Sequence, residues 1–110
     1  MMPNIEDTKK YVKTVADHRK WVLQPDKTMF NDLVEGLAIN KERFGYRSCP
    51  CRLATGGKEK DRDIICPCQY AEPDIKEYGH CYCALYLSKE FIDQNKESRK
   101  IPERRPQEKI

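Results

Sequence analysis

Six cysteines form three Cys-x-Cys pairs between residues 49 and 83, and the rest of the chain has none. The pairs are Cys49-Pro50-Cys51, Cys66-Pro67-Cys68 and Cys81-Tyr82-Cys83. Four thiolates complete an iron–sulfur cluster or a tetrahedral zinc site. The two cysteines left over are enough for one disulfide. The pattern therefore predicts a metal centre beside a redox-active disulfide.

The spacing within each pair favours an iron–sulfur cluster over zinc. Zinc sites usually space their cysteines as Cys-x2-Cys or wider, and a four-cysteine zinc site would leave two thiols without a role. A [4Fe–4S] cluster takes one thiolate at each of four irons, so its ligands can come from separate loops. Pro50 and Pro67 fix the backbone between paired thiols. We expect a [4Fe–4S] cluster, with a structural zinc site as the alternative.

Composition limits the class of protein and its partners. The chain of 110 residues is expected to form one domain over residues 1–110, and its 35% charged residues leave a net charge of only +3. This balance argues against a nucleic-acid partner. No apolar run is long enough to span a bilayer, and residues 1–10 lack the apolar stretch of a signal peptide. We expect a cytoplasmic protein with no membrane partner, in a compartment where clustered cysteines bind metals or do redox chemistry.

The first half of the chain reads as two helices. Asn4 is expected to cap the first, with Asp7 reaching back, and Gln24-Pro25-Asp26 to separate it from the second, which Gly45 ends. The apolar face of the first helix consists of Tyr11, Val12, Val15, Ala16 and Val22. The apolar face of the second consists of Met29, Phe30, Leu33, Val34, Leu37 and Ala38.

Proline and glycine punctuate residues 46–87, which we expect to form loops organised by the cysteines. Pro73 is expected to open a short helical turn that Gly79 closes, and Ser88 to cap a last helix. Residues 98–110 are expected to form an irregular tail. The predicted fold is all-α, a small single domain with helices packed around a loop-built [4Fe–4S] site.

The cysteine region resembles a known family. Residues 45–87 read GYRSCPCRLATGGKEKDRDIICPCQYAEPDIKEYGHCYCALYL, with the spacing CPC-x14-CPC-x12-CYC. This stretch resembles the catalytic chain of ferredoxin–thioredoxin reductases. The preceding helices and the tail segment 102–106 resemble that chain more loosely.

The resemblance assigns a role to each cysteine. It implies that the cluster ligands are Cys49, Cys66, Cys68 and Cys81. It implies that Cys51 and Cys83 form the active disulfide, with Cys83 against the cluster and Cys51 as the exposed sulfur that attacks the substrate. The implied enzyme is a disulfide reductase that passes single electrons from ferredoxin through the cluster to a protein disulfide such as that of thioredoxin. Plant members pair with a small β-barrel chain, so a second subunit is possible.

The chain departs from the family in two ways. Its first spacer is shorter and its second is longer, and Tyr82 stands where the family has a histidine implicated in proton handling. His80 lies one residue before the third pair and is the candidate replacement, because a tyrosine that titrates at about pH 10 is a poorer acid–base group. Arg52 is expected to favour the thiolate of Cys51.

Two other classes of function fit the same cysteines. One is a small [4Fe–4S] electron carrier in which two thiols are incidental. The other is a zinc-stabilised binding module.

Overall fold

The computed structural model describes residues 4–96 and 99–109. Within these ranges the chain forms four α-helices, α1 (Ile5–Arg19), α2 (Lys27–Phe44), α3 (Ala71–Tyr78) and α4 (Lys89–Asp93). The strands β1 (Val22–Leu23) and β2 (Tyr86–Leu87) pair as a two-stranded antiparallel ladder. Two short 3-10 helices cover Arg62–Ile64 and Gln107–Lys109. The fold is mainly helical, which confirms the predicted class, although the small ladder was not expected.

Most helix ends are set by the predicted residues. The side chain of Asn4 accepts a hydrogen bond from the Asp7 N–H at 2.9 Å, and that of Ser88 accepts one from the Phe91 N–H at 3.1 Å. Gly45 ends α2 with a φ of 86°, a conformation that glycine adopts without strain. The Asp7 carboxylate does not reach back to Asn4 as predicted. It binds Arg47 at 2.8 Å instead.

Two predicted helix boundaries are wrong. Helix α1 ends at Arg19, and Val22 is not on its face but in β1, where it pairs with Leu87. The pairing partner lies in the last third of the chain, so periodicity near Val22 could not predict it. Helix α3 begins at Ala71 rather than Pro73. Pro73 lies in the first turn, where its missing N–H has no helical partner to lose.

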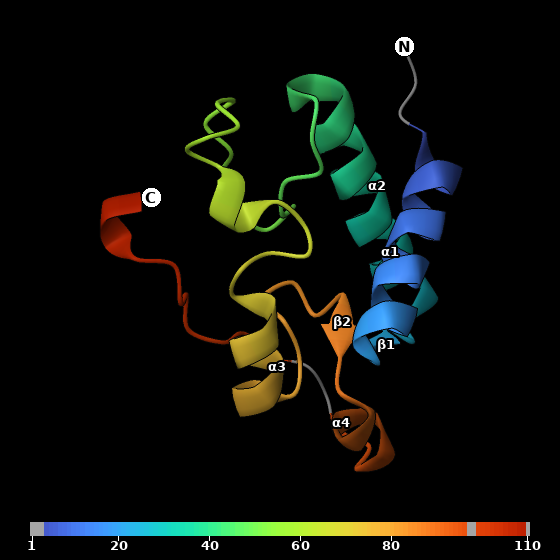
Figure 1. The fold of residues 1–110 in the computed structure, drawn as a ribbon. Coiled ribbons are helices and arrows are strands. Elements are labelled where there is room, and N and C mark those ends of the chain that lie inside the picture. The colour runs from blue at the N-terminus through green and yellow to red at the C-terminus, as the bar shows by residue number, and fades with distance from the viewer. Residues whose placement is uncertain (1–3, 97–98, 110) are drawn as a thin grey trace.

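The core joins the helices to the cysteine region. Helices α1 and α2 lie side by side (Figure 1) and bury Val12, Ala16, Val34 and Leu37. The same buried cluster contains the cysteines at positions 49, 66, 81 and 83. The thiols are therefore part of the core.

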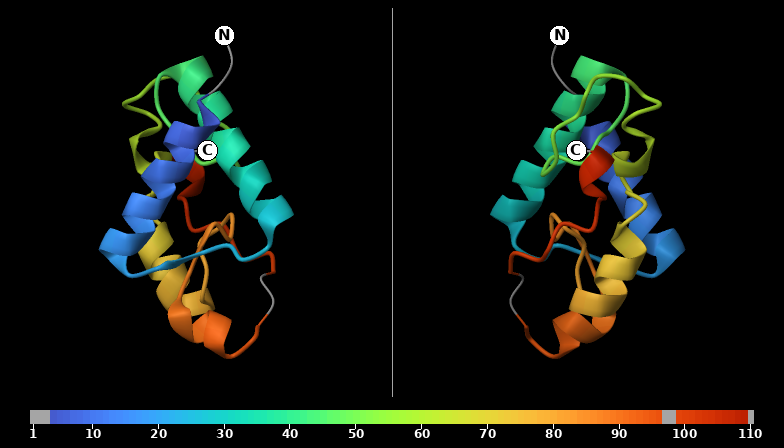
Figure 2. Two further views of the ribbon diagram at one scale, coloured as in Figure 1. Left: turned by 90° about the vertical axis from the view of Figure 1, so that its right-hand side faces the viewer. Right: turned by 90° about the vertical axis from the view of Figure 1, so that its left-hand side faces the viewer.

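The C-terminal strap, residues 99–109, lies along the body of the protein. It runs past α3 and ends beside the loop that follows α2 (Figures 1 and 2). Ile101 is buried, and Arg105 forms a buried ion pair with Asp63 at 2.9 Å. The segment is irregular up to its final 3-10 helix, and Ser98, where the irregular tail was predicted to begin, lies outside the described residues.

Candidate redox site

The three cysteine pairs meet at one cavity. Its walls include all four predicted cluster ligands and Cys83, together with the rings of Tyr82 and Tyr86. The first pair comes from the loop after α2, the second from the loop before α3, and the third from the turn between α3 and β2. Loops far apart in the sequence thus supply one site.

Backbone hydrogen bonds fix these loops relative to one another. The Cys49 N–H donates to the Ile64 carbonyl, and the Cys66 N–H donates to the Arg47 carbonyl, both at 2.8 Å. These bonds hold the first and second pairs side by side. The third pair lies in a turn closed by the Cys81 N–H, which donates to the Tyr86 carbonyl at 3.0 Å. Strand β2 therefore positions the third pair.

Three sulfurs lie close together at the edge of the cavity. The Sγ atoms of Cys49 and Cys83 are 2.9 Å apart and buried, and the Cys51 thiol is within hydrogen-bonding reach of both. Cys51 is exposed, whereas Cys83 is 7% exposed. None of the six cysteines is joined to another in a disulfide in this structure. The structure thus brings the predicted redox pair together with one predicted ligand.

The three thiols differ in acidity. Hydrogen bonds from Cys49 and Cys83 lower the pKa of Cys51 to about 4. The bond to Cys51 raises the pKa of Cys49 to about 11, and hydrogen bonds to Cys49 and Cys51 raise the pKa of Cys83. These hydrogen bonds therefore favour the thiolate of the exposed Cys51 over those of Cys49 and Cys83. An exposed thiolate is the form of cysteine that attacks disulfides.

The residues around the cavity fit an iron–sulfur cluster. Cys66 Sγ lies 3.6 Å from the Tyr86 hydroxyl, and the Tyr86 N–H donates to Cys81 Sγ at 3.5 Å. Burial raises the pKa of Cys81 to about 11, so binding a metal there must displace a proton. Within the described residues, no three Cys, His, Asp or Glu side chains are arranged to hold a single metal ion. Thiols from all three pairs line one shared cavity, and a four-iron cluster can take its ligands from separate loops in this way.

His80 does not line the cavity. It is 1% exposed, and both ring nitrogens have partners: Nδ1 lies 2.8 Å from the Cys81 carbonyl, and Nε2 accepts from the Arg99 N–H at 3.3 Å. Because a carbonyl only accepts, Nδ1 carries the proton. These contacts give His80 an anchoring position between the third pair and the strap. Its predicted role in proton transfer stays a prediction.

Tyr82 does lie at the site. Its ring borders the cavity and also a more open hollow of about 400 Å³, whose lining includes Cys51, Cys83, Met29, Arg99 and Lys100. Burial raises the pKa of Tyr82 above its ordinary value, so the phenol keeps its proton at neutral pH. The hollow gives a partner access to the Cys51 sulfur.

Sequence reasoning missed two residues of the site, Tyr86 and Glu103. Tyr86 contacts Cys66, and Glu103 binds Arg52 beside the cavity. No spacing signal connects either of them to the cysteines, because both contacts depend on the path of the chain after α3.

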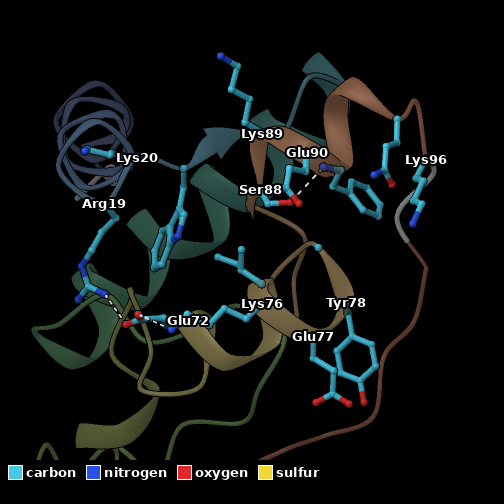
Figure 3. Close-up of a pocket in the computed structure, with 15 residues that line it drawn as sticks. Arg19, Lys20, Glu72, Lys76, Glu77, Tyr78, Ser88, Lys89, Glu90 and Lys96 are labelled. Carbon is cyan, nitrogen blue, oxygen red and sulfur yellow. Dashed lines mark hydrogen bonds and ion pairs between the residues drawn. The ribbon is translucent and has the colours of Figure 1, made fainter.

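A second hollow, of about 660 Å³, lies between α3, α4 and the end of α1 (Figure 3). Glu72 bridges Arg19 and Lys76 along one side of it, whereas Lys20, Lys89 and Lys96 stand at its rim. Its described lining contains no cysteine. This hollow is therefore separate from the thiol chemistry.

A small, mainly helical domain in which three cysteine pairs meet at one cavity, with one thiol exposed, fits a cysteine-based oxidoreductase. The family described as ferredoxin thioredoxin reductase catalytic beta chain matches residues 2–108. The chain belongs to this family, and it is an enzyme of the oxidoreductase class.

Curated relatives carry the same description. The chain is 30% identical over 84 residues to the ferredoxin-thioredoxin reductase catalytic chain of Guillardia theta, covering 74% of this chain and 78% of the relative. It is 29% identical over 87 residues to that of Porphyra purpurea, covering 77% and 70%. It is 27% identical over 99 residues to that of Cyanidium caldarium, covering 84% and 83%. None of the helices in the described residues has the length and apolar character needed to cross a membrane.

Proposed function

We propose that this chain is a ferredoxin-dependent disulfide reductase that reduces a protein disulfide such as that of thioredoxin. The supporting observation is that an exposed, acidic Cys51 lies beside Cys83 at the wall of a cavity lined by four further thiols. The names of the family and of its relatives supply the electron donor and the acceptor.

The proposed cofactor is a [4Fe–4S] cluster held by Cys49, Cys66, Cys68 and Cys81. When bound, such a cluster accepts and donates electrons one at a time. The protein's part is to exclude bulk water from three of these four sulfurs, which are buried, and to offer hydrogen bonds to them. The fourth, Cys68, is partly exposed.

Cys51 and Cys83 would carry out the thiol chemistry. The Cys51 thiolate attacks one sulfur of the substrate disulfide, which forms a mixed disulfide and releases the other substrate sulfur as a thiolate. The Cys83 sulfur then attacks Cys51, which releases the second substrate sulfur and leaves a Cys51–Cys83 disulfide. Two electrons from ferredoxin, delivered singly, and two protons restore both thiols. The open hollow beside Cys51 leaves room for the incoming disulfide.

The driving force suits this direction of transfer. Plant-type ferredoxins have potentials of about −400 mV, and thioredoxin has about −270 mV. The difference of about 130 mV corresponds to about 6 kcal/mol for two electrons. The reaction therefore needs no nucleotide. It also requires a compartment that keeps thiols reduced, such as the cytoplasm.

The test combines a spectrum with an assay. Anaerobically purified protein should show the broad visible band of an iron–sulfur cluster and should reduce thioredoxin with electrons from reduced ferredoxin. Cys51→Ser should keep the band and lose at least about 100-fold in disulfide reduction, because the attacking sulfur is gone. Leu53→Ala, at a side chain that is 89% exposed, is the matched control and should leave both unchanged.

The alternatives give different results. A colourless protein with stoichiometric zinc would support a binding module and refute the proposal. A small electron carrier would also be brown, but neither the parent nor Cys51→Ser would reduce a disulfide. Both would then accept electrons from ferredoxin and pass them on equally well. Gel filtration of the purified chain with and without a small β-barrel subunit would show whether it works alone.

A further inference from the structure

Arg52 is a buried cation between the cavity and the C-terminal strap. Its side chain is 3% exposed, and it forms a two-point ion pair with Glu103, Nε to Oε2 at 2.8 Å and Nη2 to Oε1 at 2.6 Å. Its Nη1 lies 3.4 Å from Cys68 Sγ and 3.8 Å from Cys49 Sγ. These hydrogen bonds reach two proposed cluster ligands, and the positive charge of Arg52 also contributes to the lowered pKa of Cys51, as the sequence analysis expected.

Several neighbours hold the guanidinium in this position. Its central carbon lies 4.5 Å from the centre of the Tyr82 ring and 5.3 Å from that of Tyr70. Glu103 is itself held by the Arg105 N–H at 2.9 Å. A planar guanidinium can bind a carboxylate on one edge and a sulfur on another, whereas a lysine ammonium is a single point charge. The geometry thus uses a property that only arginine has.

We propose that Arg52 is a positioning residue that raises the reduction potential of the cluster held by the four ligand cysteines, and that Glu103 keeps Arg52 in place. This inference rests on the proposed function. The electron that reduces the centre would come from ferredoxin. The reduced centre is more negative by one charge, so a cation against its ligand sulfurs stabilises it. Hydrogen bonds to the sulfurs and burial are established determinants of such potentials, and burial strengthens the effect of a nearby charge.

The first experiment is a redox titration of the cluster-loaded full chain, followed by its visible absorbance. Arg52→Gln should lower the equilibrium constant for one-electron reduction by about tenfold, which is about 59 mV for a one-electron couple. Arg52→Lys keeps the positive charge but cannot bind a carboxylate and a sulfur on separate edges. It should lower the same equilibrium constant by about threefold. If Arg52→Gln loads no cluster, the comparison of Arg52→Lys with the parent decides.

A control variant distinguishes a direct effect of Arg52 on the reduction potential from the effect of loosening the C-terminal strap. Arg104→Gln removes another strap anchor, which binds Asp74 at 2.7 Å and does not line the cavity. It should change the equilibrium constant by less than about twofold. If Arg104→Gln shifts the potential as much as Arg52→Gln does, the strap rather than Arg52 sets the potential, and the inference is wrong.

A double-mutant cycle tests the part played by Glu103. In the Arg52→Gln background, Glu103→Gln removes a nearby negative charge and should raise the potential. In the parent chain, Glu103→Gln also frees Arg52 from its ion pair. The resulting gain in the equilibrium constant for reduction should therefore be at least about threefold smaller than in the Arg52→Gln background, or it should become a loss. Additive effects would remove Glu103 from the proposal. A parent chain without a cluster would refute the proposed function as well, whereas a working parent whose potential matches that of Arg52→Gln refutes this inference alone.

Discussion

At the scale of single residues, similar thiols acquire different properties from their surroundings. Cys51 and Cys83 lie beside the same Cys49 sulfur and both line the open hollow, but Cys51 is exposed whereas Cys83 is only 7% exposed. Hydrogen bonds between the thiols favour charge on Cys51 and oppose it on Cys83. The proposed division between an attacking and a resolving sulfur thus has a physical basis in exposure and in the direction of a few hydrogen bonds.

His80 offers a test between anchoring and proton transfer. Its ring bonds to the buried Cys81 carbonyl and to the N–H of the exposed Arg99, so His80→Ala removes two hydrogen bonds, although the Cys81 carbonyl still accepts from the Ala84 N–H. We expect a loss of about 1–3 kcal/mol in the free energy of unfolding, measured by urea denaturation. The pH dependence of turnover should keep its shape. A variant of unchanged stability whose pH profile loses a limb would instead establish a role in proton transfer.

Asp61 should make stability depend on pH. It is fully buried, and although burial alone would raise its pKa, hydrogen bonds from Tyr46, Thr55 and Gly56 lower it below its ordinary value of 3.8. A lowered pKa means that the carboxylate stabilises the fold above pH 3.8 and that this contribution disappears as the pH falls through the folded value. Asp61→Asn should cost about 2 kcal/mol at pH 7.

The difference between the parent and Asp61→Asn should shrink in acid. Urea unfolding at a series of pH values between neutrality and about pH 3 measures it. Glu59→Gln is the control, because its side chain is 84% exposed. A gap between parent and Asp61→Asn that is constant over the whole pH range would contradict the assignment.

At the scale of elements, the turn between α3 and the third cysteine pair depends on Gly79. Its φ is 91°, and an added Cβ would lie 2.2 Å from Cδ2 of Phe91, so Gly79→Ala suffers both backbone strain and a clash. Gly45→Ala is the matched control, since its φ is 86° and its Cβ would meet nothing within 4 Å. We expect a cost of about 1–2 kcal/mol for Gly45→Ala and at least about 3 kcal/mol for Gly79→Ala. Equal costs in urea unfolding would mean that Phe91 moves away freely.

Local signals predicted the elements better than the contacts between them. The caps at Asn4 and Ser88 and the stop at Gly45 each depend on neighbours within a few residues, and the structure has all three. Val22 was misplaced because its partner is a distant strand. The paired cysteines predicted the candidate redox site. The hydrogen bond from Arg52 to Glu103 could not be predicted, because it joins positions 51 residues apart and no sequence periodicity encodes such a contact.

At the scale of the whole molecule, the C-terminal strap closes the structure around the site. Its arginines reach acidic residues in three other places, namely Asp63 beside the second cysteine pair and Asp74 and Glu77 on α3. A chain with a modest core and 35% charged residues gains cohesion from such long-range pairs. The strap should therefore matter for stability as well as for the environment of Arg52.

The ion pair between Arg105 and Asp63 gives the sharpest test of the strap. The two side chains are 3% and 6% exposed, so Arg105→Ala leaves a buried carboxylate without its charge partner. The Tyr70 hydroxyl still donates to that carboxylate at 2.7 Å but cannot replace the lost charge. Breaking a buried pair from one side costs about 3–5 kcal/mol.

The matched control is Arg62→Ala. It breaks a pair with Glu59 whose side chains are 75% and 84% exposed, so it should cost about 0–1 kcal/mol. Adding Asp63→Asn to Arg105→Ala should recover part of the loss, because the unpaired charge is then gone. If urea unfolding gives the two arginine variants the same stability, the strap does not hold the molecule together through this pair.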